Sequence, residues 1–104
     1  MKNYSLGNLI EYDDEKVHPK ILINEPGYRM ILLTLRAGQS LPEHTNPGIV
    51  TVNCVRGHIT FYEGPASCEL RTGDVVSIEA GALHRLEAHE DSALLVLATA
   101  KVAP

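Results

Sequence analysis

Short apolar or alternating runs, interrupted by glycine, proline or acidic residues, constrain most strongly what this chain can fold into. They recur at about one run every ten residues, a spacing typical of all-β sandwiches and barrels, and no helical period persists between them. The predicted strands are Leu6–Tyr12, Lys20–Ile23, Tyr28–Leu35, Ile49–Arg56, Ile59–Glu63, Cys68–Leu70, Val75–Ile78, His84–Ala88 and Ala93–Ala100. The fold class that this pattern indicates is all-β.

The turns between these runs have identifiable chemistry. At Glu25-Pro26-Gly27 the proline presets φ and the glycine accepts backbone angles that other residues avoid. The same residue types recur at Asn46-Pro47-Gly48 and Glu63-Gly64-Pro65. We therefore expect tight connections between antiparallel strands.

Composition bounds the domain count and the partners. A chain of 104 residues with 44% hydrophobic content has room for one domain, spanning 1–104, with a core that needs no disulfides. The net charge of -4 disfavours nucleic acid and anionic membranes as partners. The longest apolar run, 93–98, is too short to span a bilayer, and the first residues lack the apolar core of a secretory signal. We expect a cytoplasmic protein in which Cys54 and Cys68 are reduced, half-buried thiols that fill core space.

Two blocks of the chain each begin with a glycine and deliver a histidine beside strand-like sequence. The first runs from Gly38 through His44 to Gly57, and the second runs from Gly73 to His84. Imidazoles brought together from distant segments can hold a metal or transfer a proton. The pair His44 and His84 is therefore the leading candidate for a site.

The spacing within both blocks resembles the two motifs of the cupin superfamily. The matching positions are Gly38, His44 and Gly57 in the first motif, and Gly73, Glu79-Ala80-Gly81, His84 and Ala88 in the second. The resemblance covers about half of the chain. It implies a cupin-type double-stranded β-helix, which is a jelly-roll barrel of two antiparallel sheets with one pocket at its mouth.

The chain departs from the family pattern at the metal ligands. Cupin metals are usually held by three histidines and one glutamate, but Asn46 and Val50 stand here where a histidine and the glutamate are expected. His44 and His84 are therefore an incomplete metal set, since zinc and non-haem iron sites need at least three ligands. The resemblance implies either one divalent metal (Zn, Fe, Mn or Ni) or none. Glu79 and Glu87 are candidate carboxylates if loop geometry brings them to the barrel mouth.

Val50 also changes the expected pocket, because it removes a charge and adds apolar lining. The side chains expected to line the pocket beside the two histidines are Asn46, Val50, Val52, Cys54, His58 and Phe61. Such a lining favours an uncharged, partly apolar ligand. His58 follows Gly57 at a turn, where it could point to either face of its strand, whereas His18 and His89 are predicted to be surface residues.

Three functions remain open from the residues alone. The first is a stand-alone cupin that binds a small molecule, with little or no metal. The second is a metal-dependent dioxygenase or isomerase that uses His44 and His84 with an unidentified carboxylate. The third is a non-catalytic sensor or interaction module. The two histidines themselves could simply hydrogen-bond, hold a metal weakly, or act as an acid–base pair. The resemblance also implies a homodimer.

Overall fold

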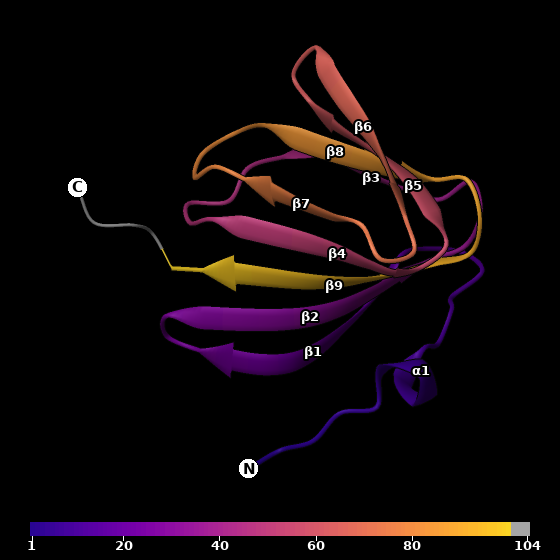
Figure 1. Ribbon diagram of the computed structural model, residues 1–104, viewed down its shortest axis with the longest axis vertical. Coiled ribbons are helices and arrows are strands. Elements are labelled where there is room, and N and C mark those ends of the chain that lie inside the picture. The colour runs from indigo at the N-terminus through magenta and orange to yellow at the C-terminus, as the bar shows by residue number, and fades with distance from the viewer. Residues whose placement is uncertain (101–104) are drawn as a thin grey trace.

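The computed structural model describes residues 1–100, whose strands form two antiparallel sheets that face one another (Figure 1). The five-stranded sheet has the order β1-β2-β9-β4-β7, and the four-stranded sheet has the order β3-β8-β5-β6. The strands are β1 (His18–Glu25), β2 (Tyr28–Leu35), β3 (Ser40–His44), β4 (Val50–Arg56), β5 (His58–Glu63), β6 (Ala66–Arg71), β7 (Val75–Ile78), β8 (His84–Ala88) and β9 (Ser92–Thr99). The prediction of an all-β jelly roll is confirmed.

Alternation of apolar and polar residues builds the core between the sheets. In β4 the side chains of Val50, Val52 and Cys54 are buried, while Thr51 and Asn53 face the other way and are half-buried. The inward faces of both sheets contribute to one aliphatic cluster, which includes a single phenylalanine, Phe61. Six of its members also line the cavity described below: Leu33, Val50, Val52, Phe61, Leu86 and Ala98.

Strand β9 lies inside the five-stranded sheet, between β2 and β4. Its residues Ala93 and Leu94 are fully buried. The strand predicted at Ala93–Ala100 therefore exists, and it takes a central position in its sheet. The strands on both sides pair with its backbone, and its side chains are buried or half-buried from Ser92 to Ala98.

The prediction of a strand at Leu6–Tyr12 is wrong. Leu6–Leu9 forms the short helix α1, and the segment that follows crosses to β1 without joining a sheet. Leu6, Leu9 and Ile10 have the i, i+3, i+4 spacing of a helix, which explains the difference. The segment is held by hydrogen bonds instead: Lys20 Nζ donates to the Leu9 carbonyl over 3.2 Å and to the Glu11 carboxylate over 3.0 Å.

The sequence pattern also missed β3. Pro42 lies within this strand and removes a backbone donor, so the run did not indicate a strand. Proline is tolerated at a sheet edge, and β3 is an edge strand. The consequence is important for function, because β3 carries His44.

The two cysteines differ in their surroundings. Cys54 is 2% exposed and so fills core space, more deeply than the half-buried position expected. Cys68 is exposed on β6, so the expectation that it fills core space is wrong. Both are free thiols. Within residues 1–100, no helix is long and apolar enough to cross a membrane.

Gly57 makes the sharp connection between β4 and β5, which belong to different sheets. Its φ is +106°, and a Cβ atom there would lie 2.3 Å from the Ser92 Oγ atom. Glycine is therefore required at this position by backbone angle and by space. This turn sets the direction in which the next residue, His58, points.

Candidate functional site

His44 and His84 lie directly opposite one another on neighbouring strands. They are register partners in the β3–β8 ladder, with a bulge between Leu41 and His44. Their ring centroids are 4.1 Å apart and their planes meet at 65°. Residues 40 positions apart in the chain thus form one pair of imidazoles, because β3 and β8 are adjacent in the four-stranded sheet.

The two rings border a cavity of about 200 Å³ between the sheets. Its lining comprises Pro19, Arg29, Ile31, Leu33, Leu41, His44, Asn46, Val50, Val52, Phe61, His84, Leu86, Val96 and Ala98. The structure therefore places six of the residues proposed from sequence around one space. Four of its lining residues carry polar side-chain groups, and the others are apolar.

Cys54 does not line this cavity. It shares a face of β4 with Val50 and Val52, but it lies further along the strand, where its side chain packs in the core. Its Sγ atom lies 3.8 Å from the Gly57 carbonyl oxygen, and burial raises the pKa of the thiol. A deeply buried, protonated thiol of this kind fills space rather than binding a ligand.

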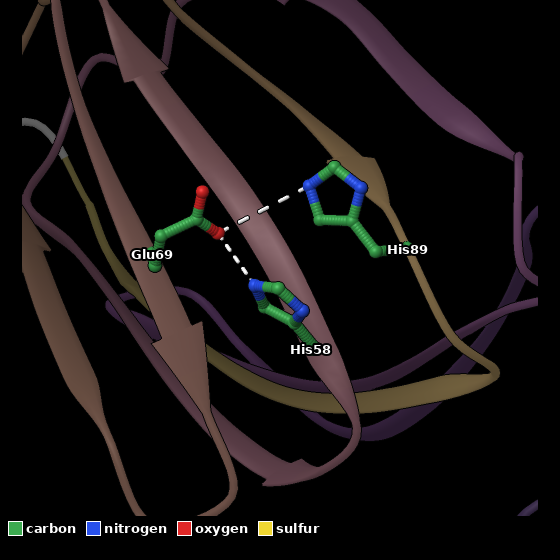
Figure 2. A group of neighbouring side chains, drawn as sticks. All are labelled: His58, Glu69 and His89. Carbon is green, nitrogen blue, oxygen red and sulfur yellow. Dashed lines mark hydrogen bonds and ion pairs between the residues drawn. The ribbon is translucent and has the colours of Figure 1, made fainter.

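His58 does not line the cavity either. Ile59 and Phe61 take the inward positions of β5, so alternation turns His58 to the outer face of the four-stranded sheet. There its imidazole lies against the carboxylate of Glu69 (Figure 2). Glu79 and Glu87, the two carboxylates proposed as further metal ligands, are also outside the cavity lining. Glu79 is exposed, and Glu87 accepts a hydrogen bond of 2.6 Å from the Tyr62 hydroxyl.

Backbone carbonyls fix which nitrogen of each cavity imidazole carries the proton. His44 Nδ1 lies 2.8 Å from the Pro42 carbonyl oxygen, and His84 Nδ1 lies 3.0 Å from the Ala82 carbonyl oxygen. Because a carbonyl oxygen only accepts, each Nδ1–H is assigned as the donor. In the neutral ring this leaves a lone pair on each Nε2 atom.

His84 is held neutral by its environment. The ring is 4% exposed and stacks on Phe61, with centroids 5.6 Å apart and planes at 18°. Burial lowers the pKa of His84 below the ordinary value of 6.5, and the neighbouring His44 lowers it further. At neutral pH its Nε2 atom is therefore a hydrogen-bond acceptor or a metal ligand.

The cavity does not offer a complete metal set. Among residues 1–100, no aspartate, glutamate or cysteine borders it. The Oδ1 atom of Asn46 already accepts the Gly48 N–H over 2.9 Å. Two imidazoles are below the three or four ligands that zinc or non-haem iron requires, so these residues do not fit the metal that the sequence resemblance implies.

Sequence reasoning missed several lining residues for which a signal existed. Arg29, Ile31 and Leu33 all line the cavity from β2. The bounds of that strand were predicted correctly, and period-two alternation places these three side chains on one face. The pattern alone did not show which face of β2 turns toward the histidines.

The comparisons agree with this architecture. Residues 31–100 match the model of the family described as "Cupin domain". No curated protein matches the sequence.

Among solved structures, the chain is similar to a conserved protein of unknown function from Streptococcus pyogenes (TM-score 0.88, 20% identity, covering 98% of this chain and 90% of that chain). It is similar to a cupin superfamily protein from Desulfitobacterium hafniense (TM-score 0.89, 18% identity, covering 96% and 92%). It is also similar to an RmlC-like cupin protein from Desulfovibrio desulfuricans (TM-score 0.88, 23% identity, covering 98% and 99%). At these identities the likeness establishes the fold.

Proposed function

Because this chain belongs to the cupin family, whose fold alone does not define an activity, we propose a function from the chemistry of its own cavity. The protein binds a small, mostly apolar organic molecule that carries a hydroxyl or similar hydrogen-bond donor. The observation that carries this proposal is an apolar cavity with two imidazole acceptors at one place in its wall.

The apolar part of the lining determines the body of the ligand. The aliphatic side chains that surround the space favour a hydrocarbon ring or short chain. A dry engineered cavity of about 150 Å³ is known to hold benzene. At about 200 Å³, this cavity has room for a substituted six-membered ring.

The imidazoles determine the polar group of the ligand. Within residues 1–100, neither Nε2 atom of His44 or His84 has a hydrogen-bond partner, because each ring bonds to a backbone carbonyl through its Nδ1 atom. Every buried side-chain nitrogen or oxygen in this part of the chain has a hydrogen-bond partner. Because the Nε2 atom of His84 has none, this atom is accessible to solvent. An incoming hydroxyl would donate to such a nitrogen, which a methyl group of the same size cannot do.

Arg29 adds a second polar feature. It is an exposed residue that lines the cavity from β2. A guanidinium group donates but does not accept hydrogen bonds. A ligand with an oxygen acceptor at its outer end, such as a carbonyl group, would therefore gain a further contact there.

A calorimetric comparison of phenol with toluene, and of cyclohexanol with methylcyclohexane, tests the proposal. The members of each pair differ mainly in the hydroxyl group. One neutral hydrogen bond contributes about 0.5–1.5 kcal/mol, so we expect the hydroxyl compounds to bind about 2- to 12-fold more tightly. This preference should disappear in the double variant His44→Phe/His84→Phe, which removes both acceptors, and persist in the outer-face variant His89→Phe. If divalent metals stabilise the cavity and none of these compounds bind, the proposal is wrong.

The metalloenzyme hypothesis is less well supported, because it requires a carboxylate beside His44 and His84. The described part of the chain supplies none within the cavity lining. The interaction-module hypothesis and the homodimer both stay predictions.

A further inference from the structure

Three side chains from neighbouring strands meet on the outer face of the four-stranded sheet, on the opposite side from the cavity. They are His58 on β5, Glu69 on β6 and His89, which directly follows β8 (Figure 2). Figure 2 shows a nitrogen of each imidazole directed toward the Glu69 carboxylate. None of the three lines the ligand cavity, so this cluster is independent of the function proposed above.

Strand register makes the cluster a fixed feature of the fold. The His89 N–H donates to the His58 carbonyl over 2.9 Å, which places these two residues side by side. Glu69 pairs with Thr60, two positions from His58 on the same face of β5. Adjacent and diagonal positions on one face of a sheet are within reach of long side chains.

The candidate ligand atoms are already close together. One nitrogen from each imidazole and one carboxylate oxygen all lie within 4.8 Å of one another. His58 Nε2 lies 2.6 Å from Glu69 Oε2, and His89 Nε2 lies 4.0 Å from the same oxygen. The imidazole centroids are 4.7 Å apart. Small side-chain rotations suffice to bring three such atoms around one ion.

We propose that His58, Glu69 and His89 form a divalent transition-metal site of the zinc class, with water in the remaining position. Two imidazoles and one carboxylate are a ligand set that zinc uses at sites with an open position. Mg²⁺ and Ca²⁺ prefer oxygen ligands, so the two nitrogen donors select against them. The side chains are 21%, 49% and 40% exposed for His58, Glu69 and His89, which leaves an entry path for the ion.

Thr60 orients the carboxylate. Its hydroxyl lies 3.1 Å and 3.0 Å from the two Glu69 carboxylate oxygens and also contacts His89 Nε2. Thr60 is only 6% exposed, so the packing around it holds its hydroxyl in place beside Glu69 and His89. Partners that orient ligand side chains in this way are a regular feature of metal sites.

Metal binding requires a proton to move on each ring. In the metal-free arrangement the Nε2–H of His58 donates to Glu69, and the Nε2–H of His89 donates to Thr60. Binding through Nε2 needs a lone pair there, so each neutral ring shifts its proton to Nδ1 through solvent, with no net proton release. A ring that starts protonated releases one proton instead.

A Zn²⁺ titration of the full chain against a chromophoric chelator tests the site. We expect wild-type protein to bind one Zn²⁺, and Glu69→Gln or His89→Gln to bind it at least about tenfold more weakly. Loss of even an orienting partner costs about 10–100-fold in metal affinity. All three residues lie on the surface side of the sheet, and thermal unfolding without metal checks that each variant folds.

Two matched controls make the result specific. His18 also faces a glutamate, Glu11, at 4.0 Å, but no second histidine joins them within residues 1–100. His18→Gln and the cavity variant His44→Gln should therefore keep wild-type affinity. Unchanged affinity in Glu69→Gln, or loss of binding in His44→Gln, would overturn the proposal.

Paramagnetic Co²⁺ provides a second readout that does not depend on variants. We expect the imidazole resonances of His58 and His89 to shift or broaden first during the titration. If the rings of His44 and His84 respond first instead, the metal binds in the cavity and the outer-face proposal is wrong.

Discussion

Placing a carboxylate at Val50 gives a quantitative test of how dry the cavity is. Val50 is 5% exposed and lines the cavity from β4. A carboxyl group has an ordinary pKa of about 4.3, and burial without a partner raises that pKa by as much as about 3–5 units. At pH 7 the Val50→Glu protein therefore folds with the carboxyl group largely protonated or poorly solvated.

The expected cost follows from the proton that the carboxyl group must take up. Protonation at pH 7 of a group with a pKa of about 4.3 costs about 3.7 kcal/mol, at about 1.36 kcal/mol per unit. In an Arg29→Gln background, which removes the guanidinium that borders the cavity, we expect Val50→Glu to have a free energy of unfolding about 3–4 kcal/mol below that of Val50→Gln. The uncharged glutamine variant shares the loss of valine packing, so the difference isolates the charge.

The sign of the pH dependence is also fixed. The folded protein holds the proton more tightly than the unfolded chain, because the folded-state pKa is raised. The stability of Val50→Glu relative to Val50→Gln therefore increases as the pH falls from 7, and the gap closes near pH 4. Urea unfolding at several pH values measures it.

The matched control is at Thr51, which faces away from the cavity on the same strand. Thr51→Glu and Thr51→Gln should unfold within about 0.5 kcal/mol of each other. In a Glu69→Gln background, which removes the outer-face site, Zn²⁺ should stabilise Val50→Glu, because the new carboxylate joins two imidazoles. Equal stability of the two Val50 variants at pH 7 would refute the claim that the cavity is a low-dielectric space.

Three further predictions concern stability and assembly. Gly57→Ala should lower the free energy of unfolding by at least about 1–3 kcal/mol, because alanine is strained at this positive φ and its Cβ atom would clash with Ser92. Gly27→Ala, where an added Cβ atom meets open space, should cost little in the same urea assay. A hydrogen bond from Lys20 lowers the pKa of Glu11, so the stability that this pair adds is complete above about pH 4.5. That stability is lost as the pH falls through the lower folded-state pKa of Glu11. Below that pH, wild type and Glu11→Gln should have the same free energy of unfolding. Light scattering should give the mass of a homodimer, and a monomer across micromolar concentrations would contradict that prediction.

Much of the fold could be predicted because alternation and turn chemistry are local signals. The bounds of Tyr28–Leu35, Val75–Ile78 and His84–Ala88 agree with the structure. The failures have local causes as well. Pro42 concealed an edge strand, and Leu6–Leu9 has apolar residues at helical spacing.

The candidate site was harder to predict because it depends on register and direction. His44 and His84 could be paired from their motif positions, but the tautomers depend on carbonyls that only the fold brings near. The side of the sheet to which His58 points follows from the turn at Gly57. The position of Glu69 beside His58 depends on the pairing of β5 with β6, which the sequence pattern alone did not indicate.

Long-range ¹H–¹⁵N spectra of the histidine rings, recorded before and after addition of phenol, test the central claim most directly. We predict that His44 and His84 carry their proton on Nδ1 and that their Nε2 resonances move when phenol enters the cavity, whereas the ring of His18 does not respond. Protonated Nε2 atoms, or resonances that ignore phenol and respond to Zn²⁺ alone, would contradict the account of a metal-free cavity that binds an organic ligand.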